Sequence, residues 1–201
     1  MYSILAGLMI SLGCIVYLQV GGVAGALLFS LGLISILTFG FNLFTGKAGL
    51  LATKEMTWLR LGGIWIGNFI GTGLAALAIR FTPLGVKVGE AAMAIANIRL
   101  ANGWLANIIL GIGCGILMYL AVSLSKKNGS PLYAIMPVGI FILSGFNHCV
   151  ADMFYFSVAK ASLNIWQTII FTTAGNIIGC NLLPLSIKLD EIIKNGVFAK
   201  K

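Results

Sequence analysis

Apolar residues gather in six long segments along this chain of 201 residues. The segments cover about 4–20, 23–51, 61–79, 105–124, 131–158 and 165–187. Each is long enough to cross a bilayer as a helix of roughly 17 residues or more. The pattern therefore predicts an all-α membrane protein, with residues 1–201 forming a single transmembrane domain of six transmembrane helices.

Two short patterns occur once in each half of the chain. Gly-Phe-Asn at 40–42 recurs at 145–147, and Gly-Asn-x-Ile-Gly at 67–71 recurs at 175–179. Two matches at similar offsets indicate a duplication of three spans, over about 1–82 and 100–190. An odd number of spans in each half makes the halves inverted repeats, which place a substrate path between interrupted helices.

The Gly-Phe-Asn tripeptides lie in the middle of the second and fifth segments, which are longer than one span needs. We therefore expect both of these helices to be interrupted there. The second pattern is read differently, because small residues at this spacing let membrane helices approach closely. It predicts helix packing.

Composition and charge support a membrane location. The chain is 59% hydrophobic and 9% charged, too few charges to cover a water-facing surface, and its mean hydropathy is +1.03. The net charge of +8 comes from basic residues between the apolar segments, so no nucleic-acid partner is expected. The first segment has no basic residue before it, and we expect a retained helix and not a cleaved signal.

The basic residues fall unequally on the two sides of the predicted membrane, which places both termini in the cytoplasm of a bacterial or archaeal cell, with the protein in its cytoplasmic membrane. The side that holds both termini has more basic residues: Lys47, Lys54, Arg60, Lys126, Lys127, Lys188, Lys194, Lys200 and Lys201. The opposite side has Arg80, Lys87, Arg99 and Lys160.

Candidate chemistry lies beside the two Gly-Phe-Asn tripeptides. His148 is the only histidine, and Asp152 follows four residues later, on the same face if the backbone there is helical. Ionisable groups at bilayer depth usually mark a pathway, although a hydrogen-bonded pair that pins the helix is the alternative. In the other half, Thr45 contributes a hydroxyl near Asn42, and Asn147 directly precedes the histidine.

The four cysteines at 14, 114, 149 and 180 all fall in apolar segments without the spacing of a zinc site. We interpret them as packing residues. No metal and no cofactor are expected.

Three motifs carry a resemblance to a known family: Phe-Ser-Leu-Gly-Leu-Ile at 29–34, Leu-Phe-Thr-Gly at 43–46, and Gly-Phe-Asn-His-Cys-Val-Ala-Asp-Met-Phe at 145–154. They resemble the formate/nitrite transporter family, which also includes hydrosulfide channels. The resemblance implies an aquaporin-like protomer, a homopentamer with one pore in each protomer, and passage of small monovalent anions. It implies no enzymatic activity.

The resemblance also assigns roles to individual residues. His148 matches the central pore histidine, and Thr45 the threonine that faces it. The remaining matches are Leu43 and Phe44 at the cytoplasmic constriction, Phe29, Leu33 and Phe141 at the periplasmic constriction, and Arg99 at the position of a vestibule lysine.

Three positions depart from the family pattern. Asn147 stands where an acidic residue commonly precedes the histidine, and Gly115 stands where the fourth helix has an asparagine. Asp152 replaces an asparagine, and a carboxylate there would stabilise a positive charge on His148 and weaken the field that attracts an anion.

These residues predict a channel or transporter for formate, nitrite or hydrosulfide. Two mechanisms fit: His148 relays a proton, since its unperturbed pKa is near 6.5, or it stays neutral and only hydrogen-bonds the passing species. A neutral-solute pore for water or ammonia is the alternative. An intramembrane transferase that uses His148 and Asp152 is a further one, although no other catalytic cluster accompanies this pair.

Overall fold

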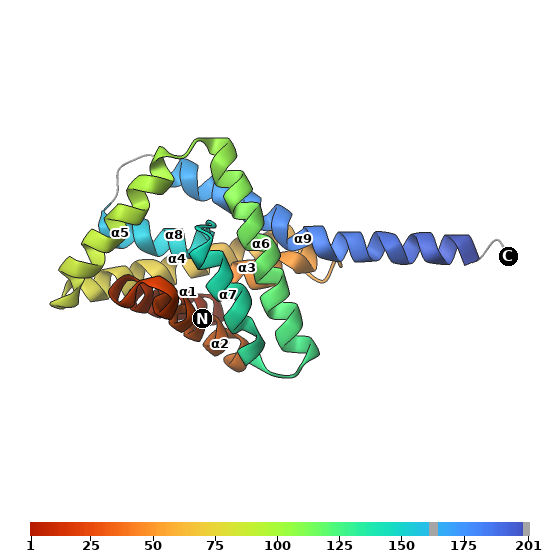
Figure 1. The fold of residues 1–201 in the computed structure, drawn as a ribbon, viewed down its shortest axis with the longest axis horizontal. Helices are drawn as coiled ribbons and strands as arrows, with labels where there is room; N and C mark the ends of the chain where they lie inside the picture. Colours follow the sequence, from red (N-terminus) through yellow and green to blue (C-terminus); the bar gives the residue numbers. More distant parts are fainter. Residues whose placement is uncertain (161–164, 199–201) are drawn as a thin grey trace.

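The structure is a computed structural model that describes residues 1–160 and 165–198. All regular elements of the described residues are helices, as predicted (Figure 1). Lys200 and Lys201 of the expected basic tail lie outside the described residues. The elements are α1 (Tyr2–Val20), α2 (Gly22–Phe39), α3 (Phe44–Ala48), the 3-10 turn η1 (Gly49–Leu51), α4 (Trp58–Arg80), α5 (Leu84–Ala101), α6 (Trp104–Lys127), the 3-10 turn η2 (Pro131–Ala134), α7 (Ile135–Leu143), α8 (Cys149–Ala159) and α9 (Ile165–Phe198).

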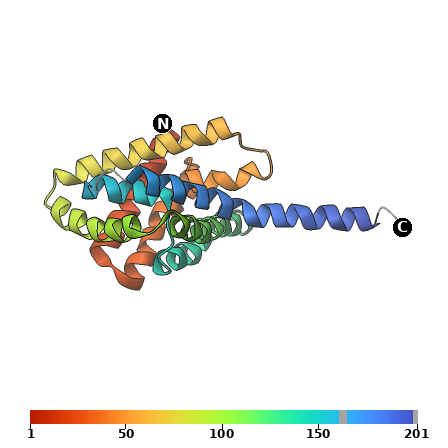
Figure 2. The same ribbon diagram turned by 90° about the horizontal axis from the view of Figure 1, so that it is seen from above.

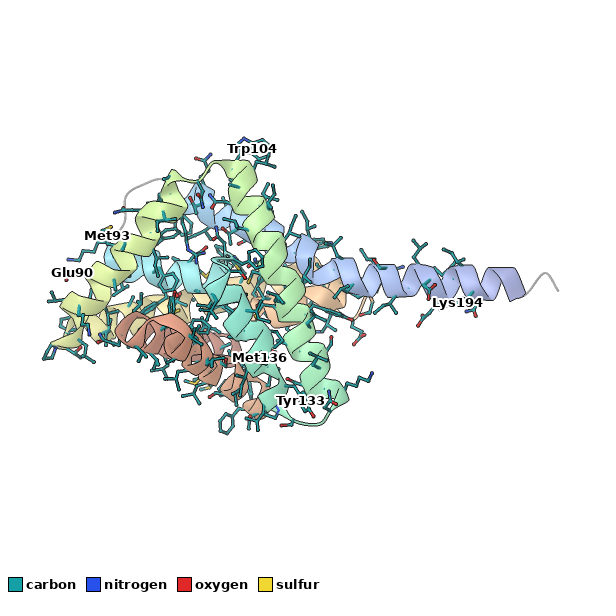
Figure 3. The ribbon with its side chains drawn as sticks, in the orientation of Figure 1. Glu90, Met93, Trp104, Tyr133, Met136 and Lys194 are labelled. Atoms are coloured by element: carbon teal, nitrogen blue, oxygen red, sulfur yellow. The ribbon has the colours of Figure 1, made fainter. Side chains whose placement is uncertain are left out.

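Five of these helices are long and apolar enough to cross a membrane: α1, α2, α4, α6 and α9. The fifth predicted segment is divided between α7 and α8, neither of which is long enough alone. Figure 3 shows Trp104 at one end of α6 and Tyr133 just beyond its other end. Exposed Trp and Tyr side chains at helix ends are typical of the two membrane–water interfaces. The chain is therefore a multi-pass membrane protein.

Both expected helix interruptions are present at Gly-Phe-Asn. The helix α2 ends at Gly40 with φ 68°, and the turn after α7 contains Gly145 with φ 72°. Only glycine adopts this left-handed conformation without a steric penalty. The chain then extends at Leu43 and at His148, from which α3 and α8 begin.

The helix α5 was not predicted, because residues 84–101 carry charges and fall between two predicted membrane segments, where a connecting loop was expected. Its buried residues Val88, Ala92 and Ala96 recur at intervals of four, the period of one helix face. This face packs against α8 and places Arg99 in the last turn of α5.

The short helix α8 forms the centre of the protein. Ten of its eleven residues are buried, and it packs against α4, α5, α1 and α9 (Figure 2). A helix without a lipid-facing side can carry polar residues that would be costly in contact with lipid. Both His148 and Asp152 occupy this sheltered position.

Glycines bring α4 close to α1 and α9 close to α6. A Cβ atom at Gly71 would overlap with the carbonyl oxygen of Ile4, and one at Gly179 would overlap with that of Ile112. These contacts confirm that the repeated Gly-Asn-x-Ile-Gly pattern serves helix packing. Beyond Pro184, α9 leaves this packed body and extends away from it, with Lys194 on the projecting part (Figures 1 and 3).

Replacing Gly179 by alanine should destabilise the protein, because the new methyl group must push α9 away from α6. Overpacking of this kind costs about 1–3 kcal/mol. We expect Gly179→Ala to lower the apparent unfolding temperature of the detergent-solubilised protein. Gly63→Ala on α4 is the matched control, because no atom outside its own helix would lie within 4 Å of the added Cβ. Equal unfolding temperatures for the two variants would contradict the packing role.

Candidate functional site

His148 lies at the N-terminus of α8 and faces Thr45 on α3. Its Nε2 atom is 2.9 Å from the hydroxyl oxygen of Thr45, and its Nδ1 atom accepts a hydrogen bond from the backbone N–H of Ala151 at 3.1 Å. Both side chains are 1% exposed. The structure thus brings together the two polar residues, 103 positions apart, that the sequence singled out in different halves.

The capping contact determines which nitrogen of His148 carries the proton. Because Nδ1 accepts a hydrogen bond, it has no hydrogen of its own in this arrangement. The neutral ring then has its hydrogen on Nε2 and donates it to Thr45 Oγ1. The site therefore presents a neutral imidazole with a fixed donor.

Two asparagines of the repeated Gly-Asn-x-Ile-Gly pattern hold the helix breaks. Asn68 accepts from the N–H of Phe44 at 2.8 Å and donates to the carbonyl of Asn42 at 2.9 Å. Asn176 accepts from the N–H of Cys149 and donates to the carbonyl of Asn147, both at 2.9 Å. Each amide thus bonds both sides of its break.

One cavity reaches His148 from the side of α5. It has a volume of about 310 Å³, and we call it the Arg99 cavity. Its lining residues are Tyr17, Ile95, Ile98, Arg99, Asn102, Leu110, Phe141, Ile142, Gly145, Phe146, Asn147, His148, Ala151 and Tyr155. Mostly apolar walls surround a few polar groups, as in small-molecule sites.

A second cavity, the Lys47 cavity, reaches Leu43 and Gly46, which flank the segment that carries Thr45, and has a volume of about 330 Å³. It carries two lysines that the sequence analysis did not assign to the site. Its lining residues are Leu33, Ile36, Leu37, Gly40, Phe41, Leu43, Gly46, Lys47, Val122, Ser125, Lys126, Gly129, Ser130 and Pro131.

Buried apolar side chains lie between the two cavities. Phe29 contacts Phe141 edge-on, with ring centroids 5.8 Å apart, and Phe141 stacks on His148 at 5.7 Å. Leu33 and Leu43 line the Lys47 cavity and are 1% exposed. Together with Thr45 and His148 they form an apolar barrier, in which Leu33 lines the Lys47 cavity and Phe141 lines the Arg99 cavity.

Other residues named from the sequence lie away from this barrier. Phe44 lines an apolar groove with Trp58 and Trp65, and Asn42 is in the lining of neither cavity. Gly115 packs against α9.

The amide on α6 comes from Asn107 and not from position 115. Asn107 Oδ1 accepts from the Asn147 side chain at 2.9 Å, which leaves Asn147 fixed at the edge of the Arg99 cavity. Asn107 itself was not among the predicted site residues.

The hydrogen-bonded pair of His148 and Asp152, which the sequence offered as an alternative, is not formed. The backbone of His148 is extended, so the two side chains do not share a helix face. Instead, Asp152 Oδ1 lies 2.6 Å from Nη1 of Arg99, 53 positions earlier on α5. The Arg99 guanidinium also lies over the ring of Tyr155, 5.7 Å from its centroid. Arg99, predicted as the vestibule cation, and Asp152, predicted as an additional carboxylate, therefore form one ion pair.

Among residues 1–160 and 165–198, no group of three His, Cys, Asp or Glu side chains is placed to hold a metal ion. The site consists of two cavities with mostly apolar walls and a few charged or polar groups, an apolar barrier, and one hydrogen-bonded Thr–His pair. This arrangement, in a multi-pass helical fold with two interrupted helices, is that of a membrane channel or transporter for small solutes.

Comparison with known proteins gives the family. The model of the family described as "Formate/nitrite transporter" matches residues 1–188. The chain belongs to the formate/nitrite transporter family, as the sequence motifs predicted.

Individual relatives agree with this assignment. The chain is 32% identical over 148 residues to the formate channel FocA of Haemophilus influenzae, an alignment that covers 65% of this chain and about half, 51%, of that relative. It is 26% identical to FocA of Escherichia coli K12 over 97% of this chain and 81% of the relative.

Two solved structures have a similar fold. A pentameric formate channel with formate bound matches with a TM-score of 0.78 and 28% identity, over 96% of each chain. An FNT family ion channel also matches with a TM-score of 0.78, at 21% identity over 90% of this chain and 84% of that one, and shows the fold alone.

Replacing Asn176 by leucine should disrupt the break before α8. The change leaves the N–H of Cys149 and the carbonyls of Asn147 and Gly111 without their partner. Each buried unsatisfied group costs about 1–3 kcal/mol. We expect Asn176→Leu to lower the unfolding temperature in detergent strongly, whereas Asn128→Leu at the exposed end of α6 has little effect. A wild-type unfolding temperature for Asn176→Leu would contradict the role of Asn176 in holding the helix break before α8.

Proposed function

We propose that this protein passes small monovalent weak-acid anions, such as formate, nitrite or hydrosulfide, across the membrane. The contact between Thr45 and His148, a polar point within the apolar barrier between two cavities, carries this proposal. Membership of the formate/nitrite transporter family and the similarity to a formate-bound channel support the choice of solute.

The physical problem is dehydration at the barrier. An isolated carboxylate loses tens of kcal/mol of solvation in a medium of low dielectric constant, and the same group as a neutral acid loses far less. The rings of Phe29 and Phe141 and the side chains of Leu33 and Leu43 create such a medium. The substrate therefore takes up a proton at the barrier and crosses as the neutral acid.

His148 acts as a neutral hydrogen-bond donor in this mechanism. Its Nδ1 atom is bound by the N–H of Ala151, so a second proton on the ring would break the N-terminal cap of α8. The Nε2–H group, which now donates to Thr45, can turn its hydrogen bond to the passing oxygen. The substrate takes its proton as hydronium from the aqueous solution on the entry side, so His148 need not give one up. Of the two mechanisms in the sequence analysis, the geometry favours the one with a neutral histidine.

We further infer that the protein is a homopentamer in a bacterial or archaeal cytoplasmic membrane, with both termini in the cytoplasm. The pentameric channel of similar fold supports the assembly, and the basic residues on the side of the termini support the orientation.

A pore for neutral solutes such as water or ammonia is the second candidate, because Asp152 compensates the charge of Arg99. Osmotic swelling of proteoliposomes without an anion gradient distinguishes the two functions. Swelling that is fast in the absence of any weak-acid flux would favour the neutral pore.

Removing either member of the central pair should slow transport. His148→Phe keeps a ring of similar size, and Thr45→Val keeps the shape of the side chain; each removes a hydrogen bond at the barrier. A lost hydrogen bond of about 1 kcal/mol or more corresponds to a rate reduction of about fivefold or more. We expect this reduction for formate, nitrite and hydrosulfide flux in proteoliposomes.

Thr38→Val is the matched control, because Thr38 is exposed and bonds only to the carbonyl of Ile34 in its own helix. Unchanged flux of all three solutes in His148→Phe would rule out a central role for this histidine.

Flux should rise as the external pH falls. Crossing as a neutral acid requires one proton for each anion, so a higher proton concentration speeds entry into the barrier. We expect formate uptake into proteoliposomes to increase steadily between about pH 7.5 and 5.5, near the range in which histidine also titrates. Nitrate, the anion of a strong acid, should show little uptake. Formate uptake that is independent of pH would argue for passage of the anion itself.

A further inference from the structure

The Arg99 cavity is lined by a cation, Arg99, whose counter-charge, Asp152, is buried and is not among the lining residues. Arg99 stands in the last turn of α5 and is 13% exposed, and Asp152 stands in the first turn of α8 and is fully buried. The carboxylate oxygen Oδ1 lies 2.6 Å from Nη1 of the guanidinium. Each group also has a favourable place on its helix, the cation at a C-terminus and the carboxylate at an N-terminus.

The pair leaves the Arg99 cavity without net charge from these two residues. The Lys47 cavity differs, because Lys47 and Lys126 line it and no carboxylate is among its lining residues. An anion that enters from the Lys47 side meets two cations. An anion that enters from the Arg99 side meets a guanidinium that already has a carboxylate partner.

A carboxylate of the protein and a carboxylate of the substrate are the same kind of ligand for a guanidinium. Arg99 has five N–H donors, and Asp152 engages one terminal nitrogen, so the group can still be reached from the cavity. Asp152 nevertheless lowers the affinity for a second anion, because like charges at close range repel and the interior screens them poorly.

We propose that Asp152 acts as an internal competitor for the substrate anion at Arg99. This inference rests on the proposed function and deepens it. Asp152 keeps the guanidinium in place beside the cavity, but it holds the affinity for the anion low. The anion of a weak acid can take up a proton and become neutral before it reaches the barrier. It therefore passes more easily than the anion of a strong acid. Asp152 is thus a specificity-determining residue.

The test uses Asp152→Asn, which removes the charge and keeps the size of the side chain. We expect the KM for formate uptake into proteoliposomes to fall by about tenfold at low ionic strength, the effect of removing one like charge close to the bound anion. The decrease should shrink at about 0.5 M salt, because screening weakens the attraction to the freed guanidinium. Binding of nitrate, measured by isothermal titration calorimetry in detergent, should become detectable or stronger.

Two further variants separate charge from structure. Glu90→Gln removes a carboxylate from the same helix as Arg99, and Figure 3 shows Glu90 at the outer side of α5; its KM should equal that of the wild type. The double variant Arg99→Gln with Asp152→Asn removes both charges, and its KM should be no lower than that of the wild type. Asp152→Ser leaves room for water beside Arg99 and should lower the KM as Asp152→Asn does.

The outcomes distinguish this inference from the proposed function. Wild-type protein without weak-acid flux would overturn the proposed function. Normal wild-type flux combined with an unchanged or higher KM in the monodisperse Asp152→Asn and Asp152→Ser proteins would overturn the competitor role alone. An equal fall in KM for the double variant would also overturn it, because that protein has no free guanidinium.

Discussion

Two membrane helices of this protein stop and restart in the apolar interior, and each break frees backbone groups that lipid cannot satisfy. The amides of Asn68 and Asn176 meet this requirement, each by bonding an N–H after the break and a carbonyl before it. Unsatisfied backbone groups at membrane depth are too costly to persist. The positions of Thr45 and His148, and so the polar point of the barrier, depend on these two amides.

The family pattern and the break positions could be predicted from the sequence, because Gly-Phe-Asn is a local signal. A glycine that adopts a positive φ ends a helix wherever it stands in an over-long apolar segment, and both Gly40 and Gly145 do so. The meeting of Thr45 with His148 was also predicted, from the resemblance of two motifs. That the halves are inverted repeats stays a prediction, which the matching bonds of Asn68 and Asn176 support.

Other parts of the site depend on contacts that no local pattern contains. Spacing of four residues suggested a pair of His148 and Asp152, but this rule presumes a continuous helix, and the helix begins only after His148. The true partner of Asp152, Arg99, lies on α5, whose alanine-rich buried face gives a weak apolar signal. The role of Asn68 and Asn176 in holding the helix breaks could not be predicted for another reason. An asparagine between glycines suggests helix packing, which the same segments also provide.

Rigidity is divided unequally across the hydrogen bond between Thr45 and His148. His148 begins an eleven-residue helix that is buried on almost every side, whereas Thr45 lies on the five-residue α3, which continues into the 3-10 turn η1. A helix of one turn has few backbone hydrogen bonds of its own, so it deforms at a lower free energy than a packed helix. When the barrier opens, α3 with Thr45 therefore moves more easily than α8, and His148 stays in place.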